Sequence, residues 1–222
     1  MKILVCNAGS TSLKFKLYEL PAGTVLARAG IERVGSENDA LFHYVNEEND
    51  SGIDLAGQNI PDYRTGIRRF LSCLTDPVTG VLGSVSEIER VGFKATLSRG
   101  HLGLHELDED CLQGMRDWID MAPLHNRAYL SAIEVMREVL PDALFVGAFE
   151  TAFHQNIPLE RRLFGVPFEW YERYGVQRLG YHSASHSYIA DVLRQREGET
   201  YAAISCHLGG SCSVCAIQNG RS

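Results

Sequence analysis

Apolar and polar residues alternate near the start of the chain in a way that predicts a short antiparallel meander. The expected strands are 2–6 (KILVC), 13–20 (LKFKLYEL) and 24–34 (TVLARAGIERV). Residues 7–12 between the first two are all small or polar, as in a tight turn. Leu13, Phe15 and Leu17 fall on one face of the second strand, because successive side chains of a strand point to opposite sides. These three residues are expected in the core.

The rest of the chain mixes helical and strand patterns, which is typical of an α/β fold. Helical spacing of apolar residues predicts helices at 62–75, 108–120, 127–140 and 185–197. Apolar or alternating runs predict strands at 91–98, 143–151, 201–210 and 212–220. Asn126 is expected to cap the third helix. The polar segment 35–60 is interpreted as a poorly packed hairpin or excursion.

The last strand–turn–strand repeats the plan of the first, about 200 residues later. In both, an apolar strand ends near Cys6 or Cys206, a Gly/Ser turn follows, and an alternating strand comes next. One such pair leaves duplication and coincidence equally open. Asn219-Gly220 is a strong hairpin turn with no strand after it, so the chain is expected to be a fragment.

Composition narrows the class of protein. The 222 residues are 45% hydrophobic and 22% charged, which suits a globular core and argues against global disorder. A net charge of −7 and a pI near 5.6 argue against nucleic acid or an anionic membrane as partners. The six cysteines are sparse and uneven, and no run is apolar enough for a secretion signal or a membrane span. A cytoplasmic location is therefore expected.

Two glycine-rich turns, 9–12 and 209–213, can offer backbone N–H groups and hydroxyls to an anion. Facing each other, they would hold a polyphosphate from two sides. For each turn taken singly, an ordinary turn is the favoured interpretation. Neither matches the Walker or dinucleotide-binding fingerprints, because no helix follows the glycines.

Three other patterns carry candidate chemistry. His182 and His186 have the i, i+4 spacing of a metal pair, but the Glu of the HExxH motif is absent, so zinc is the weaker interpretation. Cys212 and Cys215 form a CxxC without a partner motif and are interpreted as structural. Glu150 follows a buried strand, where either a catalytic carboxylate or a capping acid would fit.

Nearly the whole chain resembles the acetate kinase family. The motifs that carry the resemblance occur in the family's order: NAGSTSLKFKL, MAPLHN, FETAFHQNIP, YGVQRLGYHSASH and ISCHLGGSCSVCAIQNGRS. The resemblance implies an actin-like (ribonuclease H-like) fold of two lobes that close on ATP-Mg²⁺ and a small carboxylate. Residues 1–198 would be the N-terminal lobe with its mixed sheet, and 199–222 the start of a nucleotide-binding lobe whose remainder is missing. It also implies a homodimer.

The resemblance also implies roles for individual residues. The catalytic residues would be Lys94, Glu150 and His182. The carboxylate would contact Lys94, Thr96, Leu124 and Tyr181. ATP would contact Ser10, Ser12, Lys14, His207, Gly209, Gly210 and Ser211. Asn7 would lie at the metal.

Several positions depart from the family pattern. Glu150 stands for an Asp, Lys94 for an Arg and Gly210 for an Asn, while Phe93 replaces a His, Thr96 a Val and Tyr181 a Phe. Glu adds a methylene to the acidic arm, and Lys lacks the bidentate fork of Arg. These changes leave two interpretations, a retuned kinase or a non-catalytic remnant that serves in dimerisation or binding. The exchanges at Leu97 and Ser98 have no explanation in the sequence.

The intact first hairpin, the MAPLHN run and His182 favour an ATP-dependent kinase for acetate, propionate or another short-chain carboxylate. A sugar kinase of the same superfamily would need polar side chains where Leu124 and Tyr181 predict an apolar pocket. The length of the acyl chain stays open.

Overall fold

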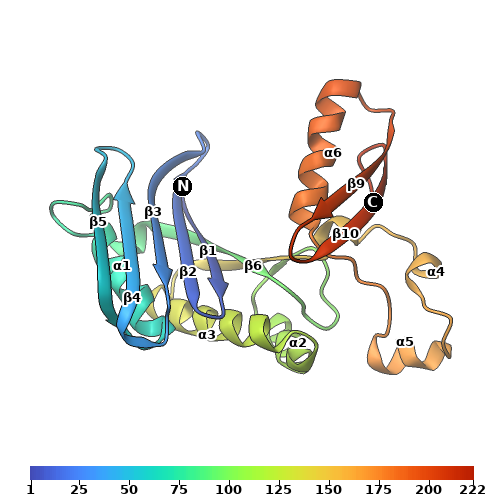
Figure 1. Cartoon of the computed structure of the whole chain (residues 1–222), viewed down its shortest axis with the longest axis horizontal. Coiled ribbons are helices and arrows are strands. Elements are labelled where there is room, and N and C mark those ends of the chain that lie inside the picture. The colour runs from blue at the N-terminus through green and yellow to red at the C-terminus, as the bar shows by residue number, and fades with distance from the viewer.

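The computed structural model describes residues 1–222 and is dominated by one eight-stranded mixed sheet (Figure 1). Its strands are β1 (Lys2–Gly9), β2 (Ser12–Glu19), β3 (Thr24–Glu32), β4 (Ser36–Asn46), β5 (Ser51–Ile60), β6 (Ile88–Ala95), β7 (Leu104–Glu106) and β8 (Leu144–Phe149). The order across the sheet is β5-β4-β3-β2-β1-β6-β8-β7. β6 runs parallel to both β1 and β8, and the other pairs are antiparallel.

Three helices join this sheet in one large apolar core: α1 (Tyr63–Leu74), α2 (Glu109–Asp117) and α3 (Pro123–Val139). Leu13, Phe15 and Leu17 are buried as expected, whereas Lys14 and Lys16 on the opposite face of β2 are exposed. Side chains of β2 therefore pack on the helical side only. None of the helices is long and apolar enough to cross a membrane.

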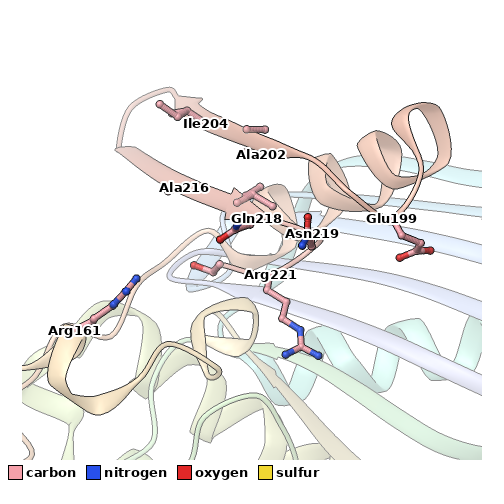
Figure 2. A pocket seen from close by; sticks show the side chains of 11 residues that line it. Arg161, Glu199, Ala202, Ile204, Ala216, Gln218, Asn219 and Arg221 are labelled. Atoms are coloured by element: carbon pink, nitrogen blue, oxygen red, sulfur yellow. The ribbon is translucent and has the colours of Figure 1, made fainter.

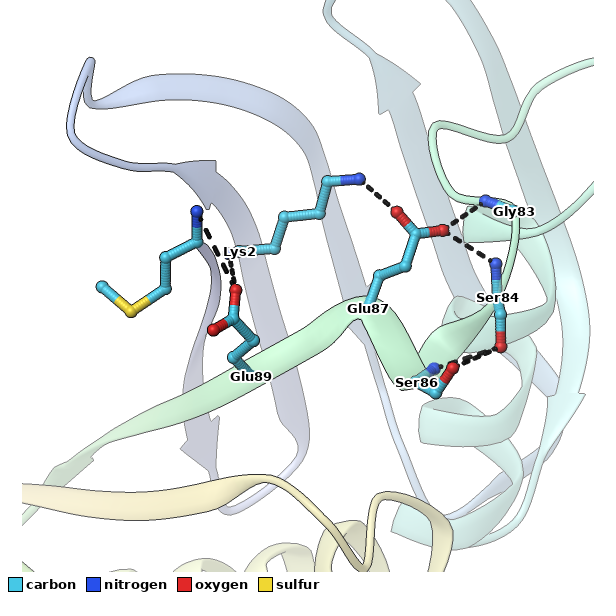
Figure 3. Close-up of polar contacts among 7 residues, drawn as sticks. Lys2, Gly83, Ser84, Ser86, Glu87 and Glu89 are labelled. Atoms are coloured by element: carbon cyan, nitrogen blue, oxygen red, sulfur yellow. Dashed lines mark hydrogen bonds and ion pairs between the residues drawn. The ribbon is translucent and has the colours of Figure 1, made fainter.

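Two acidic side chains attach the start of β1 to the start of β6 (Figure 3). Glu87 pairs with Lys2 and accepts hydrogen bonds from the backbone N–H groups of Gly83 at 2.7 Å and Ser84 at 3.0 Å. Glu89 accepts a hydrogen bond from the backbone N–H of Lys2 at 3.3 Å. The hydrogen bond from Lys2 is the main cause that lowers the pKa of the Glu87 carboxyl. These contacts help to hold β1 beside β6 in parallel register.

The end of the chain forms a smaller unit apart from the large sheet (Figure 1). It contains α6 (Ser183–Glu197) and the antiparallel pair β9 (Ala202–Leu208) and β10 (Cys212–Gln218). Ala190 of α6 packs with Cys215 and Ile217 of β10, so the helix covers one face of the hairpin. The remaining short elements are η1 (Val85–Glu87), η2 (Ile119–Met121), η3 (Ala152–His154), α4 (Leu159–Arg162) and α5 (Phe168–Tyr174).

One sequence expectation about local structure is wrong in part and another is wrong. Segment 35–60 forms the expected hairpin, from the antiparallel strands β4 and β5, but it is not poorly packed, because β4 buries Ala40, Phe42 and Tyr44 on one face. Asn126 does not cap α3, which begins at Pro123, a residue whose fixed φ suits the first helical position. Asn126 is instead fully buried within the helix and donates hydrogen bonds to the carbonyls of Leu97 and Met115.

Candidate functional site

The parallel strands β1, β6 and β8 end at the same edge of the sheet, which brings their C-terminal residues together. Asn7 lies near the end of β1, Thr96 directly follows β6, and Glu150 directly follows β8. The Glu150 backbone N–H donates to the Ala95 carbonyl at 2.9 Å. Three of the predicted site residues thus share one edge although they are far apart in sequence.

Lys94 and Glu150 form an ion pair at this edge. Lys94 projects away from the core because its neighbours Phe93 and Ala95 take the buried positions of β6. Its side chain is 49% exposed, whereas that of Glu150 is 18% exposed. The cation therefore remains accessible to an anionic ligand while the carboxylate is partly enclosed.

His182 lies directly beyond this pair, at the start of α6. The Ser183 backbone N–H donates to the Glu150 carbonyl at 3.2 Å, which attaches the helix start to the end of β8. The His182 ring stacks on His207 of β9, with ring centroids 4.0 Å apart. Its two nitrogens contact Ser213 Oγ at 2.9 Å and Ser211 Oγ at 3.1 Å. The second glycine turn is therefore held against His182.

Two cavities meet at Glu150 and His182. The first, about 810 Å³, is lined by the predicted substrate residues Thr96, Leu124 and Tyr181 together with Ser211. The second, about 820 Å³, is mainly apolar and is lined by Lys94 and His207 among others. Gly180, directly before Tyr181 and His182, has a φ of +76°. A Cβ at this position would lie 2.5 Å from the His154 ring, so only glycine fits.

A third cavity, of about 1030 Å³, runs along the β9–β10 hairpin near Arg161 and Arg221 (Figure 2). None of the predicted site residues lines it. Ile204 in its wall is 72% exposed, so this is an open strand surface rather than an enclosed site. The predicted residues are brought together only at the two cavities around His182.

The first hairpin turn lies outside these cavities. Ser10, Ser12 and Lys14 line neither of them, and neither do Gly209 and Gly210. The Ser10 carbonyl accepts a hydrogen bond from the Tyr63 hydroxyl at 3.0 Å. The structure therefore brings the predicted carboxylate and phosphoryl residues together but leaves most of the predicted ATP residues at the periphery.

The available oxygen donors fit a magnesium ion that is bound chiefly through phosphate. Asn7 Oδ1 and the Glu150 carboxylate are hard oxygen ligands. The Tyr129 hydroxyl donates to Asn7 Oδ1 at 3.4 Å, and the Glu150 charge contributes, after burial, to raising the pKa of the same phenol. No group of three or more His, Cys, Asp or Glu side chains in the structure is arranged to hold a metal ion. Mg²⁺ commonly uses one or two carboxylates, waters and substrate phosphates, so such a cluster is unnecessary.

Comparison with known proteins identifies the family. The model of the Acetokinase family matches residues 2–222. This chain belongs to that family. It is 36% identical over its whole length to the acetate kinase of Acetivibrio thermocellus and 35% identical to that of Brachyspira hyodysenteriae. In each case it spans 56% of the relative, so the chain covers about half the length of the curated relatives it matches.

Solved structures agree with this assignment. The acetate kinase of Porphyromonas gingivalis matches 99% of this chain with a TM-score of 0.83 at 30% identity, over 55% of its own length. A propionate kinase from Francisella tularensis has a TM-score of 0.85 at 23% identity, which supports the fold alone. The expected family and the expected α/β fold with a mixed sheet are confirmed.

The structure explains three of the departures from the acetokinase pattern as packing. Phe93 is 1% exposed and stacks on Phe145, with ring centroids 6.4 Å apart. Leu97 packs in a small cluster with Trp118 and Ala122. The fully buried Ser98 donates to the Cys111 carbonyl at 2.8 Å. Leu97 and Ser98 line neither cavity, and Phe93 is almost wholly buried at the wall of the second.

Sequence reasoning missed Tyr129 as a site residue. It lies on α3, is 2% exposed, and contacts Asn7. Burial, and secondly the charge of Glu150, raises the pKa of Tyr129 to about 12, so it remains a neutral hydrogen-bond donor. A hydroxyl on the otherwise apolar face of that helix was the available indication.

Sequence reasoning also missed that His186 is buried in a cluster with His154, His182 and His207. His186 is fully buried, and burial followed by the nearby His154, His182 and His207 lowers its pKa. His154 reaches this cluster from η3 and His207 from β9. His186 is thus part of a buried hydrogen-bonded core, in which Ser205 and Ser213 contact its two ring nitrogens.

Acidification should destabilise the fold through His186. The unfolded chain takes up a proton on this residue near pH 6.5, whereas the folded chain does so only at lower pH. Stability from the neutral ring is therefore complete above about pH 6.5 and falls as the pH drops through the folded pKa. Urea unfolding of the chain between pH 8 and 5 should show this loss. His186→Gln should lose part of the pH slope, while the exposed His43→Gln should keep it; equal slopes in all three proteins would contradict the assignment.

Proposed function

We propose that these residues form part of an ATP-dependent kinase that reversibly converts acetate or propionate into the acyl phosphate. The observation that supports this most directly is the convergence of Lys94, Glu150 and His182 between two cavities in a member of the acetokinase family. Since the chain spans about 55% of its relatives, the activity is proposed for a polypeptide that contains this chain. Within it, residues 1–198 would form the first lobe and 199–222 would begin the second, and the enzyme would be a homodimer.

The chemistry would be an in-line phosphoryl transfer. A carboxylate oxygen of the substrate forms a bond to the γ-phosphorus of ATP while the bond to the β–γ bridging oxygen breaks, and ADP leaves with that electron pair. Negative charge spreads over the three equatorial oxygens of the transferring group. The Lys94 ammonium and an N–H of His182 are suited to stabilise this charge, because both side chains line the cavities.

Glu150 and Asn7 would hold the metal side of the site. Both offer oxygen ligands, and a bound Mg²⁺ would neutralise phosphate charge there. Glu150 also orients Lys94 through the ion pair. Its side chain is only 18% exposed, so its position is well defined.

The wall of the first cavity suits a short acyl group. Leu124 and Tyr181 contribute apolar surface, and Thr96, 8% exposed, closes one side. A sugar would need several polar partners at this wall. The other alternative is a non-catalytic remnant. Such a protein would not require an ion pair between Lys94 and Glu150 at the edge of the cavity.

An acyl phosphate assay tests the proposal. Residues 1–222 should form negligible acetyl phosphate with ATP, Mg²⁺ and hydroxylamine, because they supply only one side of a nucleotide cleft. A longer polypeptide that contains this chain should be active and should lose activity when Mg²⁺ is chelated. Absence of acetyl and propionyl phosphate from the longer protein would favour the remnant, and vigorous activity of residues 1–222 alone would overturn the two-lobe proposal.

A further inference from the structure

A continuous line of hydrogen bonds connects the interior of the small unit to His182. Ser205 Oγ lies 2.9 Å from His186 Nδ1, and His186 Nε2 lies 2.7 Å from Ser213 Oγ. Ser213 Oγ in turn lies 2.9 Å from His182 Nδ1, and His182 Nε2 lies 3.1 Å from Ser211 Oγ. The line begins at a buried serine and ends at an exposed one.

The fold places these groups in line for a simple reason. Ser205 and Ser213 occupy positions of β9 and β10 that face α6, because Cys215, opposite Ser205, packs on that helix. His182 and His186 are four residues apart and so lie on one side of the helix start. Ser213 Oγ therefore bridges two imidazole rings.

Proton counting leaves two directions for the line. Each neutral imidazole has one N–H and one acceptor nitrogen, and each hydroxyl has one proton to donate. If both rings donated to Ser213, its own hydroxyl proton would have no acceptor, because the two rings are its only hydrogen-bond partners. With Ser213 donating to one of the rings, either every proton points from Ser205 toward Ser211, or every proton points the opposite way. The two directions differ in which nitrogen of His182 is protonated.

The buried Ser205 hydroxyl decides which of the two proton arrangements is favoured. Ser205 is 5% exposed, and His186 Nδ1 is the only hydrogen-bond partner of its hydroxyl. If His186 donated to Ser205, the buried hydroxyl proton would have no acceptor, whereas Ser205 donating to His186 Nδ1 leaves no donor unpaired. The cost of an unpaired buried donor corresponds to a preference of about 5- to 150-fold for the second arrangement.

We infer that Ser205, His186 and Ser213 act as positioning residues that hold the proton of His182 on Nε2. His186 then donates from Nε2 to Ser213, and Ser213 donates to His182 Nδ1. The exposed Nε2–H of His182 contacts Ser211 in the absence of substrate and is free to donate to a phosphoryl oxygen when the cavity is filled.

Two further observations support a neutral line. The His207 ring stacks on His182 with an interplanar angle of 12°, so a charge on either ring would disfavour a charge on the other. His186 is faced by His182 on its own helix, His154 from η3 and His207 from β9, and burial together with these rings lowers its pKa. A tautomer fixed by hydrogen bonds supplies an N–H donor without requiring protonation.

Two-bond ¹H–¹⁵N correlation NMR of residues 1–222 at pH 8 tests the inference, because it shows which ring nitrogen holds the proton. The wild-type chain should show His182 with Nε2 protonated in at least about fivefold excess. Ser213→Ala should lower this excess, and Ser205→Ala should lower it to a smaller extent although Ser205 does not contact His182. Ser213→Thr retains the hydroxyl and should restore the wild-type spectrum.

The exposed Ser72 hydroxyl, which donates to the Arg69 carbonyl on α1, provides a matched control, and Ser72→Ala should change nothing. A wild-type His182 protonated on Nδ1, or an unchanged His182 spectrum in Ser213→Ala, would overturn the inference. The role of the Nε2–H in catalysis rests on the proposed function. The NMR measurement reports the His182 tautomer and does not depend on enzymatic activity. If a longer protein shows the fixed tautomer but no activity, the kinase proposal fails and the inference about the tautomer stands.

Discussion

Replacing His182 by alanine is expected to lower kcat for acyl phosphate formation by about 10²–10³ in a polypeptide that contains this chain and is active, with little change in KM. A donor that acts on the phosphoryl group during transfer stabilises the transition state more than the bound substrates. His182 lines both cavities, which gives its ring access to that group. Initial-rate kinetics over a range of acetate and ATP concentrations would measure the effect.

The backbone at His182 calls for a second variant. Its φ is +57°, a left-handed conformation that alanine adopts at a cost, whereas asparagine tolerates it. His182→Asn should therefore retain most of the stability that His182→Ala loses, while kcat stays low in both. His43→Ala, an exposed histidine on β4, should leave kinetics unchanged. If activity returns in step with stability in His182→Asn, the residue is structural.

Local sequence patterns were sufficient for the elements that bury one regular face. The alternation at Leu13, Phe15 and Leu17 identified β2 and its core side, because a half-buried strand imposes a period of two. β4 has the same alternation at Ala40, Phe42 and Tyr44, but the polar residues around it obscured the pattern. For Asn126 the local pattern was misleading. Asparagine is a typical helix cap, but here its side chain is buried and donates hydrogen bonds to the carbonyls of Leu97 and Met115.

The site was predictable only in part, for a similar reason. The end of an apolar strand can be recognised from the sequence alone, and this was sufficient to identify Glu150 as a candidate. The contact of Tyr129 with Asn7 joins residues 122 positions apart. The bridge from Ser213 to two histidines likewise depends on how α6 packs on β10. Such contacts follow from tertiary packing, which local periodicity does not encode.

The Lys94–Glu150 pair provides the second prediction, because it combines two of the departures that the family resemblance implies, in direct contact at the cavity edge. The longer Glu150 arm reaches an ammonium point charge, and the pair is formed in the structure. Glu150→Asp would shorten that arm, and Lys94→Arg would introduce a planar fork that needs different carboxylate geometry. Each single change is therefore expected to lower kcat/KM for acetate by about tenfold, or about 1.4 kcal/mol of transition-state stabilisation.

The double variant Lys94→Arg/Glu150→Asp is expected to recover part of this loss. Residues in direct contact commonly couple by about 0.5–3 kcal/mol, so the double variant should lose clearly less than the about 100-fold that two independent tenfold losses would give. Arg28→Lys, at the exposed Arg28–Glu47 pair remote from the cavities, is a matched control and should leave kcat/KM unchanged. Strict additivity would mean that Lys94 and Glu150 act independently. A large gain from either single change would mean that the present residues mark decay of the site, because a tuned pair should be disrupted by changing one partner alone.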